Sequence, residues 1–357
     1  MFAKIISVLL CLATLLCSLS ACTNSDGDMG GQSEDVPKTQ ARSYYDYFDT
    51  VSGIYSYRGD SAEDFEKNCE AVSELLNEYH RLFDIYYEYA GINNLKTVNN
   101  NAGKEPIEVD AKLIDFLLYA KQIYELTDGA TNIAMGSVLV LWHNARDNGI
   151  DDPENAALPD TDALAAASAH TDIDNLIINK EEGTVFICDP LMSIDVGSIG
   201  KGYATERAAE LLIERGVNSY VLNIGGNIRA IGEKTTGEGW ITGITNPDKS
   251  TDNEFVCKVD IKDISLVTSG DYERYYIVDN TRYHHIIDPK TNMPADYFSS
   301  ISIFTKDSAL ADALSTALFC MSYEEGLALI TRIGGIDAIW VDKSGEVKMT
   351  DGVVIHQ

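Results

Sequence analysis

A glycine-rich stretch in the middle of the chain constrains the fold more than any other feature. Residues 193–204 read Ser-Ile-Asp-Val-Gly-Ser-Ile-Gly-Lys-Gly-Tyr-Ala and follow an apolar run over residues 184–188. In residues 203–214 the apolar side chains recur at helical spacing, and Gly216 stands where a helix often ends. These features predict a strand, then a tight turn, then a helix.

The polar residues of this turn have two interpretations. Backbone N–H groups at a helix start, next to the charge of Lys201, suit a phosphate group. Asp195 and Ser198 could hold a metal ion beside that phosphate, because carboxylate and hydroxyl oxygens bind hard cations. The alternative is a tight turn with an exposed lysine, since glycine-rich motifs are common.

The first 21 residues have the pattern of a secretory signal peptide. Lys4 precedes an apolar run that is too short for a comfortable membrane span, and small residues close the segment. The tetrapeptide Leu-Ser-Ala-Cys that ends at Cys22 resembles a bacterial lipobox. It predicts a diacylated Cys22 and a protein anchored by lipid at the extracytoplasmic face of the cell membrane. The alternative is an ordinary cleaved signal in a freely secreted protein.

The chain after the signal peptide divides into a tether and a folded part. Residues 22–43 are polar and contain almost no large apolar side chain, which predicts a flexible tether. Residues 44–357 are numerous enough to bury a substantial core, in one large unit or two closely packed ones. No segment of this part is long and apolar enough to span a bilayer.

Charge and cysteine usage exclude several classes of ligand. The chain has 27 basic and 56 acidic residues, a formal net charge of −29, which argues against nucleic-acid binding and against direct adhesion to anionic lipid. An anionic ligand therefore needs metal ions or a local group of lysine and arginine. The cysteines beyond Cys22 are far apart and form no CxxC motif, so we expect buried thiols at Cys69, Cys188, Cys257 and Cys320.

Helical and strand-like segments are mixed without regular alternation, which favours an α+β domain over a doubly wound sheet. A long loop is expected over residues 83–101 and an acidic loop over residues 148–160. Helices are predicted at residues 61–81, 110–127, 162–170 and 308–319. Strands are predicted at residues 175–178, 184–188, 219–224, 240–244, 255–261, 275–278 and 300–304.

Three further segments contain residues suited to chemistry. Residues 223–229, Asn-Ile-Gly-Gly-Asn-Ile-Arg, place a double glycine after a strand, which either allows close approach of a ligand or forms a hairpin turn. Residues 268–274 form a polar turn between two predicted strands. The adjacent His284 and His285 precede an Asp-Pro turn and could supply a catalytic base or a metal ligand.

The predicted helix over residues 308–319 has polar residues at positions i, i+3 and i+4. Asp312, Ser315 and Thr316 therefore share one face, where their oxygens could form a compact site for Mg²⁺. The alternative is a half-buried helix whose hydroxyl groups bond to its own backbone. The next helix begins with a capping box from Ser322 to Glu325.

These segments resemble the ApbE family, the FAD:protein FMN transferases. Residues 195–204 are similar to its D-x-G-x-x-x-K-G-Y-A signature, and residues 223–230 to its N-x-G-G-D-I-R-A block. Residues 268–274, 285–291 and 311–318 resemble three further blocks in the same order. The resemblance implies an α+β, T-fold-related domain with antiparallel sheets and packed helices, with FAD in a cleft between two subregions.

The resemblance also implies an activity: FMN is transferred from FAD to a Thr or Ser hydroxyl of a target protein, and AMP is released with the help of one or two Mg²⁺ ions. It leaves open whether His285 or Asp271 is the base. The implied catalytic residues are His285, Asp312, Lys201 and Asp271; the FAD contacts are Ala130, Thr131, Asn132, Asp195, Lys201, Gly225, Gly226, Ser269 and Ile287; and the Mg²⁺ ligands are Ser198, Asp312, Ser315 and Thr316.

The implied partner is a flavoprotein with an Asp-x-x-Thr-type motif, in a membrane redox complex or in an extracytoplasmic flavin domain. Thr131-Asn132 and Asn227 depart from the family's usual Phe-Asp and Asp, which could loosen flavin contacts or alter the metal site. Two other functions stay open: a Mg²⁺-dependent FAD pyrophosphatase that yields FMN and AMP, and a lipoprotein that binds FAD without reaction. The residues that separate transferase from pyrophosphatase lie in the loop around Asn93 and Asn94.

Overall fold

The computed structural model describes residues 39–57 and 60–357, so the predicted signal peptide and Cys22 lie outside the described residues. The predicted end of the tether at residue 43 is wrong, because strand β1 (Gln40–Tyr44) already belongs to the folded domain. β1 pairs with β2 (Ser52–Ser56), and the Tyr44 hydroxyl donates to the Cys69 carbonyl at 2.8 Å. The sequence does not predict this edge strand, because its side chains are mostly polar and it is stabilised by backbone hydrogen bonds to β2. Among the described residues, no helix is both long and apolar enough to cross a lipid bilayer.

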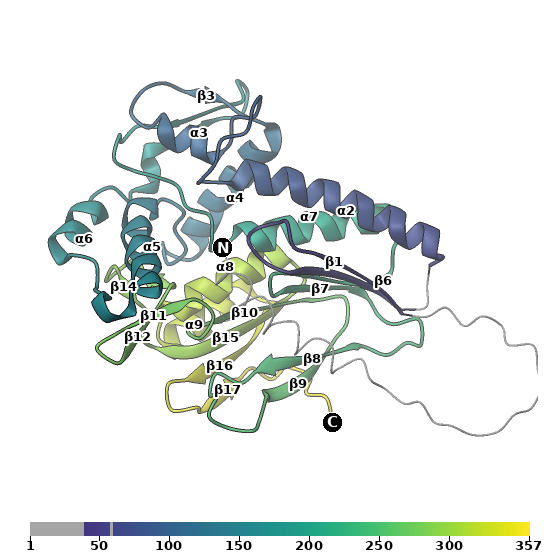
Figure 1. The fold of residues 1–357 in the computed structure, drawn as a ribbon. Helices are drawn as coiled ribbons and strands as arrows, with labels where there is room; N and C mark the ends of the chain where they lie inside the picture. The colour runs from purple at the N-terminus through teal and green to yellow at the C-terminus, as the bar shows by residue number, and fades with distance from the viewer. Residues whose placement is uncertain (1–38, 58–59) are drawn as a thin grey trace, which may run out of the picture.

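An antiparallel sheet of eight strands forms the centre of the domain (Figure 1). The strands lie in the order β1, β2, β6, β7, β10, β15, β16 and β17, so hairpins of consecutive strands alternate with pairs from distant parts of the chain, such as β2 and β6. Beyond the first two, they are β6 (Ser219–Ile224), β7 (Asn227–Gly232), β10 (Ser265–Gly270), β15 (Phe298–Thr305), β16 (Asp337–Asp342) and β17 (Val347–Met349).

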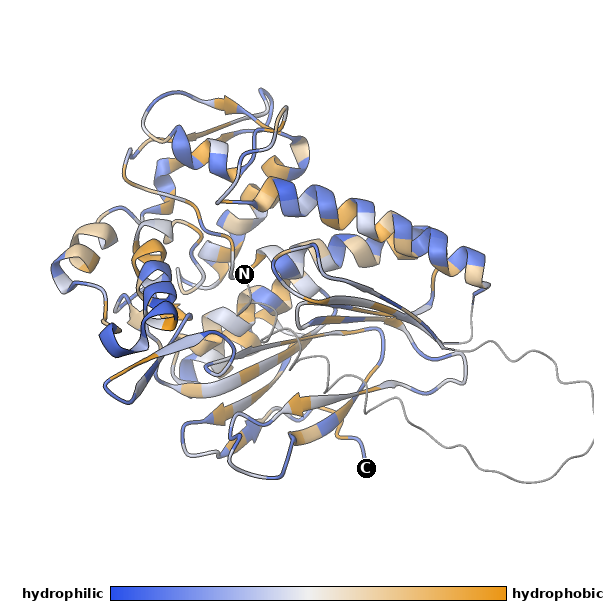
Figure 2. Ribbon diagram, in the orientation of Figure 1, coloured by the Kyte–Doolittle hydropathy of each residue, from blue (hydrophilic) through white to orange (hydrophobic). Residues whose placement is uncertain are grey.

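Helices and a hairpin cover the two faces of this sheet. Helices α7 (Gly200–Glu214) and α8 (Ser308–Phe319) pack on one face, and α2 (Ala62–Phe83) packs against α7 (Figure 1). The hairpin of β8 (Trp240–Thr245) and β9 (Phe255–Ile261) covers the other face with its own apolar core. Hydrophilic and hydrophobic residues are interleaved along α2, as the burial of only one of its sides requires (Figure 2).

The remaining elements form a second subregion beside the helices. Its small sheet has the order β3, β5, β4, and the hairpin of β11 and β12 packs against α5. These elements are α3 (Leu95–Asn100), β3 (Ile107–Glu108), α4 (Ala111–Leu126), α5 (Gly136–Asp151), η2 (Pro153–Asn155), α6 (Thr161–Ser168), η3 (Ile173–Asn175), β4 (Leu176–Asn179), β5 (Thr184–Ile187), β11 (Tyr275–Val278), β12 (Thr281–His284), β13 (Ile287–Asp288) and β14 (Met293–Pro294), with α9 (Tyr323–Ile333) behind α8.

The α+β class is confirmed, and the predicted bounds of α8, β6, β9 and β11 agree with the structure. The long loop expected over residues 83–101 is wrong in part, since it contains α3. Asn94 caps this helix by accepting the Thr97 N–H at 3.1 Å, and Leu95 and Val98 are buried. Helix α5 likewise extends to Asp151, into the expected acidic loop. The capping box from Ser322 to Glu325 is confirmed at the start of α9.

Candidate functional site

The start of α7 and the side chain of Asp312 on α8 form the centre of the site. Ile199, the N-cap residue of α7, supplies no side-chain hydrogen bond, and Asp312 Oδ2 accepts the Gly202 N–H at 2.7 Å instead. A Cβ atom at Gly202 would lie 2.3 Å from Asp312 Cβ and 2.5 Å from the Ser308 carbonyl oxygen. The glycine is therefore required by the close packing of the two helices.

Lys201 lies beside this carboxylate. Its Nζ is 4.0 Å from Asp312 Oδ2 and 3.5 Å from the Gly197 carbonyl oxygen, so it links α8 to the turn that contains Ser198. Burial raises the pKa of Asp312, and the charge of Lys201 and the Gly202 N–H oppose that rise. The structure thus brings Lys201 and Asp312 together, as the two separate motifs predict.

The hydroxyl groups on α8 have different partners. Ser315 Oγ donates to the Asp312 carbonyl at 2.9 Å and lies 2.8 Å from Ser269 Oγ on β10, so Ser269 donates to it. Thr316 and Ser198 are half-buried. Among the described residues no group of three or more His, Cys, Asp or Glu side chains could hold a metal ion. One carboxylate with hydroxyl groups is a hard oxygen donor set, which fits Mg²⁺ better than zinc.

The two adjacent histidines differ in environment because successive side chains of a strand point to opposite faces. His284 is buried, its Nε2 donates to the Ala295 carbonyl at 2.8 Å, and its Nδ1 accepts the Ile286 N–H at 3.2 Å. Both ring nitrogens of His284 are thus occupied, and burial lowers its pKa. His284 is a structural residue.

His285 keeps one ring nitrogen available. The Arg274 carbonyl accepts the His285 backbone N–H at 3.0 Å and the ring Nδ1–H at 3.2 Å. Since a carbonyl can only accept, Nδ1 carries the proton and Nε2 retains its lone pair. Burial, followed by the charges of Arg274 and Lys201, lowers the pKa of His285 well below its ordinary value. The imidazole is therefore neutral at pH 7.

Asp271, the other predicted base, is buried among cations. Its Oδ2 lies 2.9 Å from Lys343 Nζ, and its Oδ1 lies 3.5 Å from Arg282. Its charge acts on His284, which lies on the side of β12 away from His285. The Asp271 carboxylate therefore has two cationic partners, Lys343 and Arg282, and we assign it a structural role.

The predicted FAD loop lies between α8 and the glycine-rich turn. The Thr131 hydroxyl donates to the Ala313 carbonyl at 2.8 Å, and the Asp195 N–H donates to the Ile133 carbonyl at 2.8 Å. Asn132 donates to the Thr171 carbonyl at 2.9 Å. The loop therefore connects Asp312, Asp195 and the end of α6 through backbone carbonyls.

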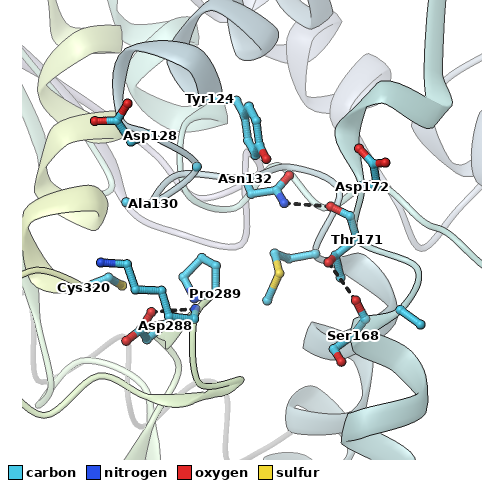
Figure 3. Close-up of a pocket in the computed structure, with 14 residues that line it drawn as sticks. Tyr124, Asp128, Ala130, Asn132, Ser168, Thr171, Asp172, Asp288, Pro289 and Cys320 are labelled. Carbon is cyan, nitrogen blue, oxygen red and sulfur yellow. Dashed lines mark hydrogen bonds between the residues drawn. The ribbon is translucent and has the colours of Figure 1, made fainter.

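A cavity of about 340 Å³ opens beside this loop, within the size range of small-molecule sites. Figure 3 shows Ala130 and Asn132 on one side of it and Asp288 and Pro289 on the other. Ile287 is buried directly before Asp288. The cavity thus joins the FAD loop to the His285 segment, and its lining is Tyr124, Asp128, Gly129, Ala130, Asn132, Met135, Ser168, Ala169, Thr171, Asp172, Asp288, Pro289, Lys290 and Cys320.

The double glycine forms a tight turn between β6 and β7. Gly225 and Gly226 both have positive φ, and a Cβ at Gly225 would lie 2.5 Å from Thr50 Cγ2. β10 pairs with the start of β7 through Val267 and Asn227 and then continues to Gly270. The turn therefore lies beside the Ser269 end of β10, although no hydrogen bond in the described part of the chain joins either glycine to Asp312 or Lys201.

Two further residues, Tyr86 and His143, interact electrostatically with Asp195 and are not among the predicted site residues. Burial, followed by the charge of Asp195, raises the pKa of Tyr86. Burial lowers the pKa of His143 on α5, and the charges of Asp195, Arg146 and Arg274 also act on it. The only sequence signal for Tyr86 is the tyrosine-rich loop after α2. Its interaction with Asp195 requires the folded chain.

Asn99 is another residue missing from the predicted site. Its side chain accepts the Ile194 N–H at 2.8 Å and donates to the Ile194 carbonyl at 2.9 Å. Asn99 thus holds the residue directly before Asp195, which accepts the Gly197 N–H at 2.9 Å. The asparagine run after residue 98 was its only signal in the sequence.

Comparisons with known proteins agree with this geometry. The model of the ApbE family matches residues 48–340. A protein of Treponema pallidum named FAD:protein FMN transferase is 31% identical over 363 residues, which cover 98% of this chain and 94% of that protein. One of the same name from Klebsiella pneumoniae is 29% identical and covers 79% of this chain and 84% of its own length.

Two solved structures have the same fold. The ApbE protein of Thermotoga maritima superimposes with a TM-score of 0.76 at 28% identity, covering 88% of this chain and 97% of the other. The flavin transferase ApbE of Vibrio cholerae gives a TM-score of 0.73 at 25% identity, covering 87% and 96%. The similarity therefore extends over the sheet, the helices and the second subregion.

Proposed function

The chain belongs to the ApbE family, and we propose that the start of α7, the Asp312 face of α8 and His285 form its flavin-transfer site. The protein is an FAD:protein FMN transferase, which transfers FMN from FAD to a target protein. The proposal for the site is supported by one observation above all. Asp312 and Lys201 lie 4.0 Å apart, and the Thr131 hydroxyl ties α8 to the loop that lines a cavity of about 340 Å³.

The reaction requires attack on the diphosphate of FAD. The acceptor hydroxyl oxygen forms a bond to the phosphorus on the flavin side, and the bond from that phosphorus to the oxygen bridging to AMP breaks. AMP leaves with that oxygen. His285 Nε2 takes the hydroxyl proton, because it has a free lone pair and the ring is fixed by the Arg274 carbonyl. Asp271 is the weaker candidate, since Lys343 and Arg282 hold its carboxylate.

The proposed metal site consists of Asp312, Ser198, Ser315 and Thr316. Asp312 uses Oδ2 for Gly202, and no hydrogen bond among the described residues engages its Oδ1. When bound, Mg²⁺ supplies positive charge that stabilises the negative charge developing on the diphosphate. Lys201 adds a second positive charge on the same side, in a protein that is otherwise strongly acidic.

The nucleotide contacts are proposed for residues on either side of the cavity. Ala130, Thr131 and Asn132 belong to a loop whose side chains are fixed to backbone carbonyls, which leaves backbone groups to face a ligand. Ile287 is buried directly before Asp288, which lines the cavity. The other proposed contacts are Asp195, Lys201, Gly225, Gly226 and Ser269.

A direct test uses mass spectrometry of the purified protein with FAD, Mg²⁺ and an acceptor domain that carries an Asp-x-x-Thr-type motif. We expect the acceptor to gain one FMN while an equal amount of AMP appears and no free FMN accumulates. Free FMN with AMP and an unlabelled acceptor would instead identify an FAD pyrophosphatase. Unchanged FAD would contradict both enzymatic activities and leave FAD binding alone.

We also propose that Cys22 is diacylated and anchors the protein at the extracytoplasmic face of the cell membrane. A lipid anchor would bring the enzyme close to flavoprotein subunits of membrane redox complexes, or to extracytoplasmic flavin domains. The support is the lipobox-like sequence before Cys22. Metabolic labelling with palmitate should mark the native protein and not a Cys22→Ser variant. Equal labelling of both would contradict the proposal.

A further inference from the structure

Each of the helices α7 and α8 provides a carboxylate that accepts a backbone N–H from the first turn of the other helix. Asp312 of α8 accepts the Gly202 N–H of α7 at 2.7 Å, as described above. In return, Glu206 Oε2 of α7 accepts the Ser308 N–H, the first of α8, at 2.7 Å. The N–H groups at a helix start are otherwise unpaired, and a carboxylate there also interacts favourably with the helix dipole. Each helix thus supplies a hydrogen-bond acceptor for a backbone N–H in the first turn of the other.

The spacing of these two contacts fixes how the helices lie along each other. Gly202 and Glu206 are one turn apart on α7, and Ser308 and Asp312 are one turn apart on α8. The order of the pairs makes the helices antiparallel, with both contacts separated by about 6 Å at a rise of 1.5 Å per residue. A shift of α8 along α7 by a single residue would break both hydrogen bonds.

Glu206 is not needed to form α8. Asp307, the N-cap residue, already accepts the Ala309 N–H at 2.7 Å and the Leu310 N–H at 3.2 Å. The contact from Glu206 adds only the Ser308 N–H, but it comes from another helix. Its specific effect is therefore on the position of α8 relative to α7.

Glu206 is itself held in place by the sheet. It is 7% exposed, and its Oε2 lies 3.4 Å from Nε of Arg229, a 5% exposed residue of β7. Arg229 also lies 3.5 Å from Asp263, at the turn before β10. A buried carboxylate with a cationic partner and a backbone donor has a defined position, since the loss of either partner leaves a charge unpaired.

We propose that Glu206 is a positioning residue for flavin transfer. By holding the first N–H of α8, it sets the place of α8 on α7 and so keeps Asp312 in reach of Gly202 and Lys201. This inference rests on the proposed function, because it requires Asp312 to bind the metal ion. It concerns a residue that touches neither the metal site nor the FAD cavity.

The test measures metal binding directly, with Mn²⁺ as the probe. Free Mn²⁺ is quantified by electron paramagnetic resonance for the whole protein with FAD present, alongside Tm and the Mg²⁺ dependence of turnover. Glu206→Ala should weaken Mn²⁺ binding about tenfold, the scale found for residues that orient metal ligands. Glu206→Gln keeps an oxygen acceptor for the Ser308 N–H and should stay within about threefold of the native affinity by the same measure.

Two controls separate the possible failures. Val72→Ala in α2 creates a cavity in the core away from α8, and should lower Tm without a change in Mn²⁺ affinity. Asp312→Ala should abolish Mn²⁺ binding. If Glu206→Ala binds Mn²⁺ as tightly as Val72→Ala does, the positioning role is overturned. If Asp312→Ala retains Mn²⁺ binding, the proposed metal site fails instead.

If Glu206→Ala fails to fold, Glu206→Asp is measured in its place. Glu206→Asp keeps the charge near Arg229 but withdraws the acceptor oxygens by one methylene, so it should also weaken Mn²⁺ binding, to a smaller degree than Glu206→Ala. Native affinity in a folded Glu206→Asp would count against the role. If Glu206→Gln loses as much Mn²⁺ affinity as Glu206→Asp, Glu206 does not act through its hydrogen bond to the Ser308 N–H, and the proposal is overturned.

Discussion

The α7–α8 junction and the cavity beside Ala130 hold the two parts of the site in different ways. At the junction, Asp312 is 5% exposed and its place depends on the Gly202 N–H, with no space for even a methyl group between the helices. The cavity is built from loops whose side chains, such as Asn132, bond to backbone carbonyls.

Because of this difference, we expect the two regions to have different roles in the reaction. A group that acts only as the diphosphate reacts must be fixed to within a fraction of an ångström, which close packing of two helices provides. A region that binds the nucleotide equally before and during reaction changes affinity and not turnover. Substitutions at the junction should therefore lower kcat, and substitutions at the cavity should mainly weaken FAD binding.

Asp312→Ala should have the largest effect. Loss of the carboxylate removes the proposed metal ligand and the acceptor for the Gly202 N–H, and turnover should fall about 1,000-fold, as for removal of a central electrostatic group. AMP release from FAD measures the rate. Asp260→Ala on β9, across the sheet, is the matched control and should keep near-native turnover. Comparable rates in the two variants would remove Asp312 from the site.

His285→Gln should lower kcat by about 100-fold or more, the usual contribution of a general base. FAD binding, followed by the change in flavin fluorescence, should stay near native because the side chain acts on the acceptor proton. The same measurement on Asp271→Asn decides between the two predicted bases. A larger kcat loss in Asp271→Asn than in His285→Gln would assign the base to Asp271.

The pH dependence of turnover should reflect the lowered pKa of His285. The base must be neutral, and burial with the charges of Arg274 and Lys201 disfavours its protonated form. Turnover should therefore remain level as the pH falls through about 6.5, the ordinary histidine value, and then drop about tenfold per pH unit below the lowered pKa. A decline in the native protein that begins above pH 6.5, and is absent in His285→Gln, would contradict the assigned pKa direction.

Gly202→Ala should act on stability as well as on rate. The added methyl would lie 2.3 Å from Asp312 Cβ, and overpacking of this kind costs about 1–3 kcal/mol of unfolding free energy. Denaturant unfolding measures the loss. Gly326→Ala on α9 is the matched control, because only the flexible Leu318 side chain lies near, at 3.1 Å. Equal stability of both variants would show that the helices can separate without cost.

The sequence predicts the junction better than the cavity, for a physical reason. Lys201 and Asp312 each lie in a short segment whose helical spacing and residue types reveal chemistry locally, and the structure places them 4.0 Å apart. Strands β4, β5, β6, β8, β9, β11 and β15 and helix α8 follow equally from local periodicity. These features depend on neighbours within a few residues along the chain.

Features that depend on distant segments could not be predicted. Strands β1 and β2 lack an alternating apolar pattern strong enough to detect, and they form because their backbones pair with each other and with β6. The charge of Asp195 acts on Tyr86, more than 100 positions earlier, only when the chain has folded. The exchange of Glu206 and Asp312 between helices likewise joins residues more than 100 positions apart.

Asn132→Ala should have the smallest effect and tests the cavity half of the comparison. The amide holds the FAD loop to the Thr171 carbonyl at 2.9 Å and accepts the Ala134 N–H at 2.8 Å, so its loss frees the loop without moving Asp312. One hydrogen bond of about 1 kcal/mol predicts a roughly fivefold weaker Kd for FAD, with kcat nearly native. Fluorescence titration with FAD measures it, against Asn155→Ala at an exposed turn outside the cavity. A kcat loss as large as that of His285→Gln, at an unchanged Kd, would mean that the two regions are not separate in function.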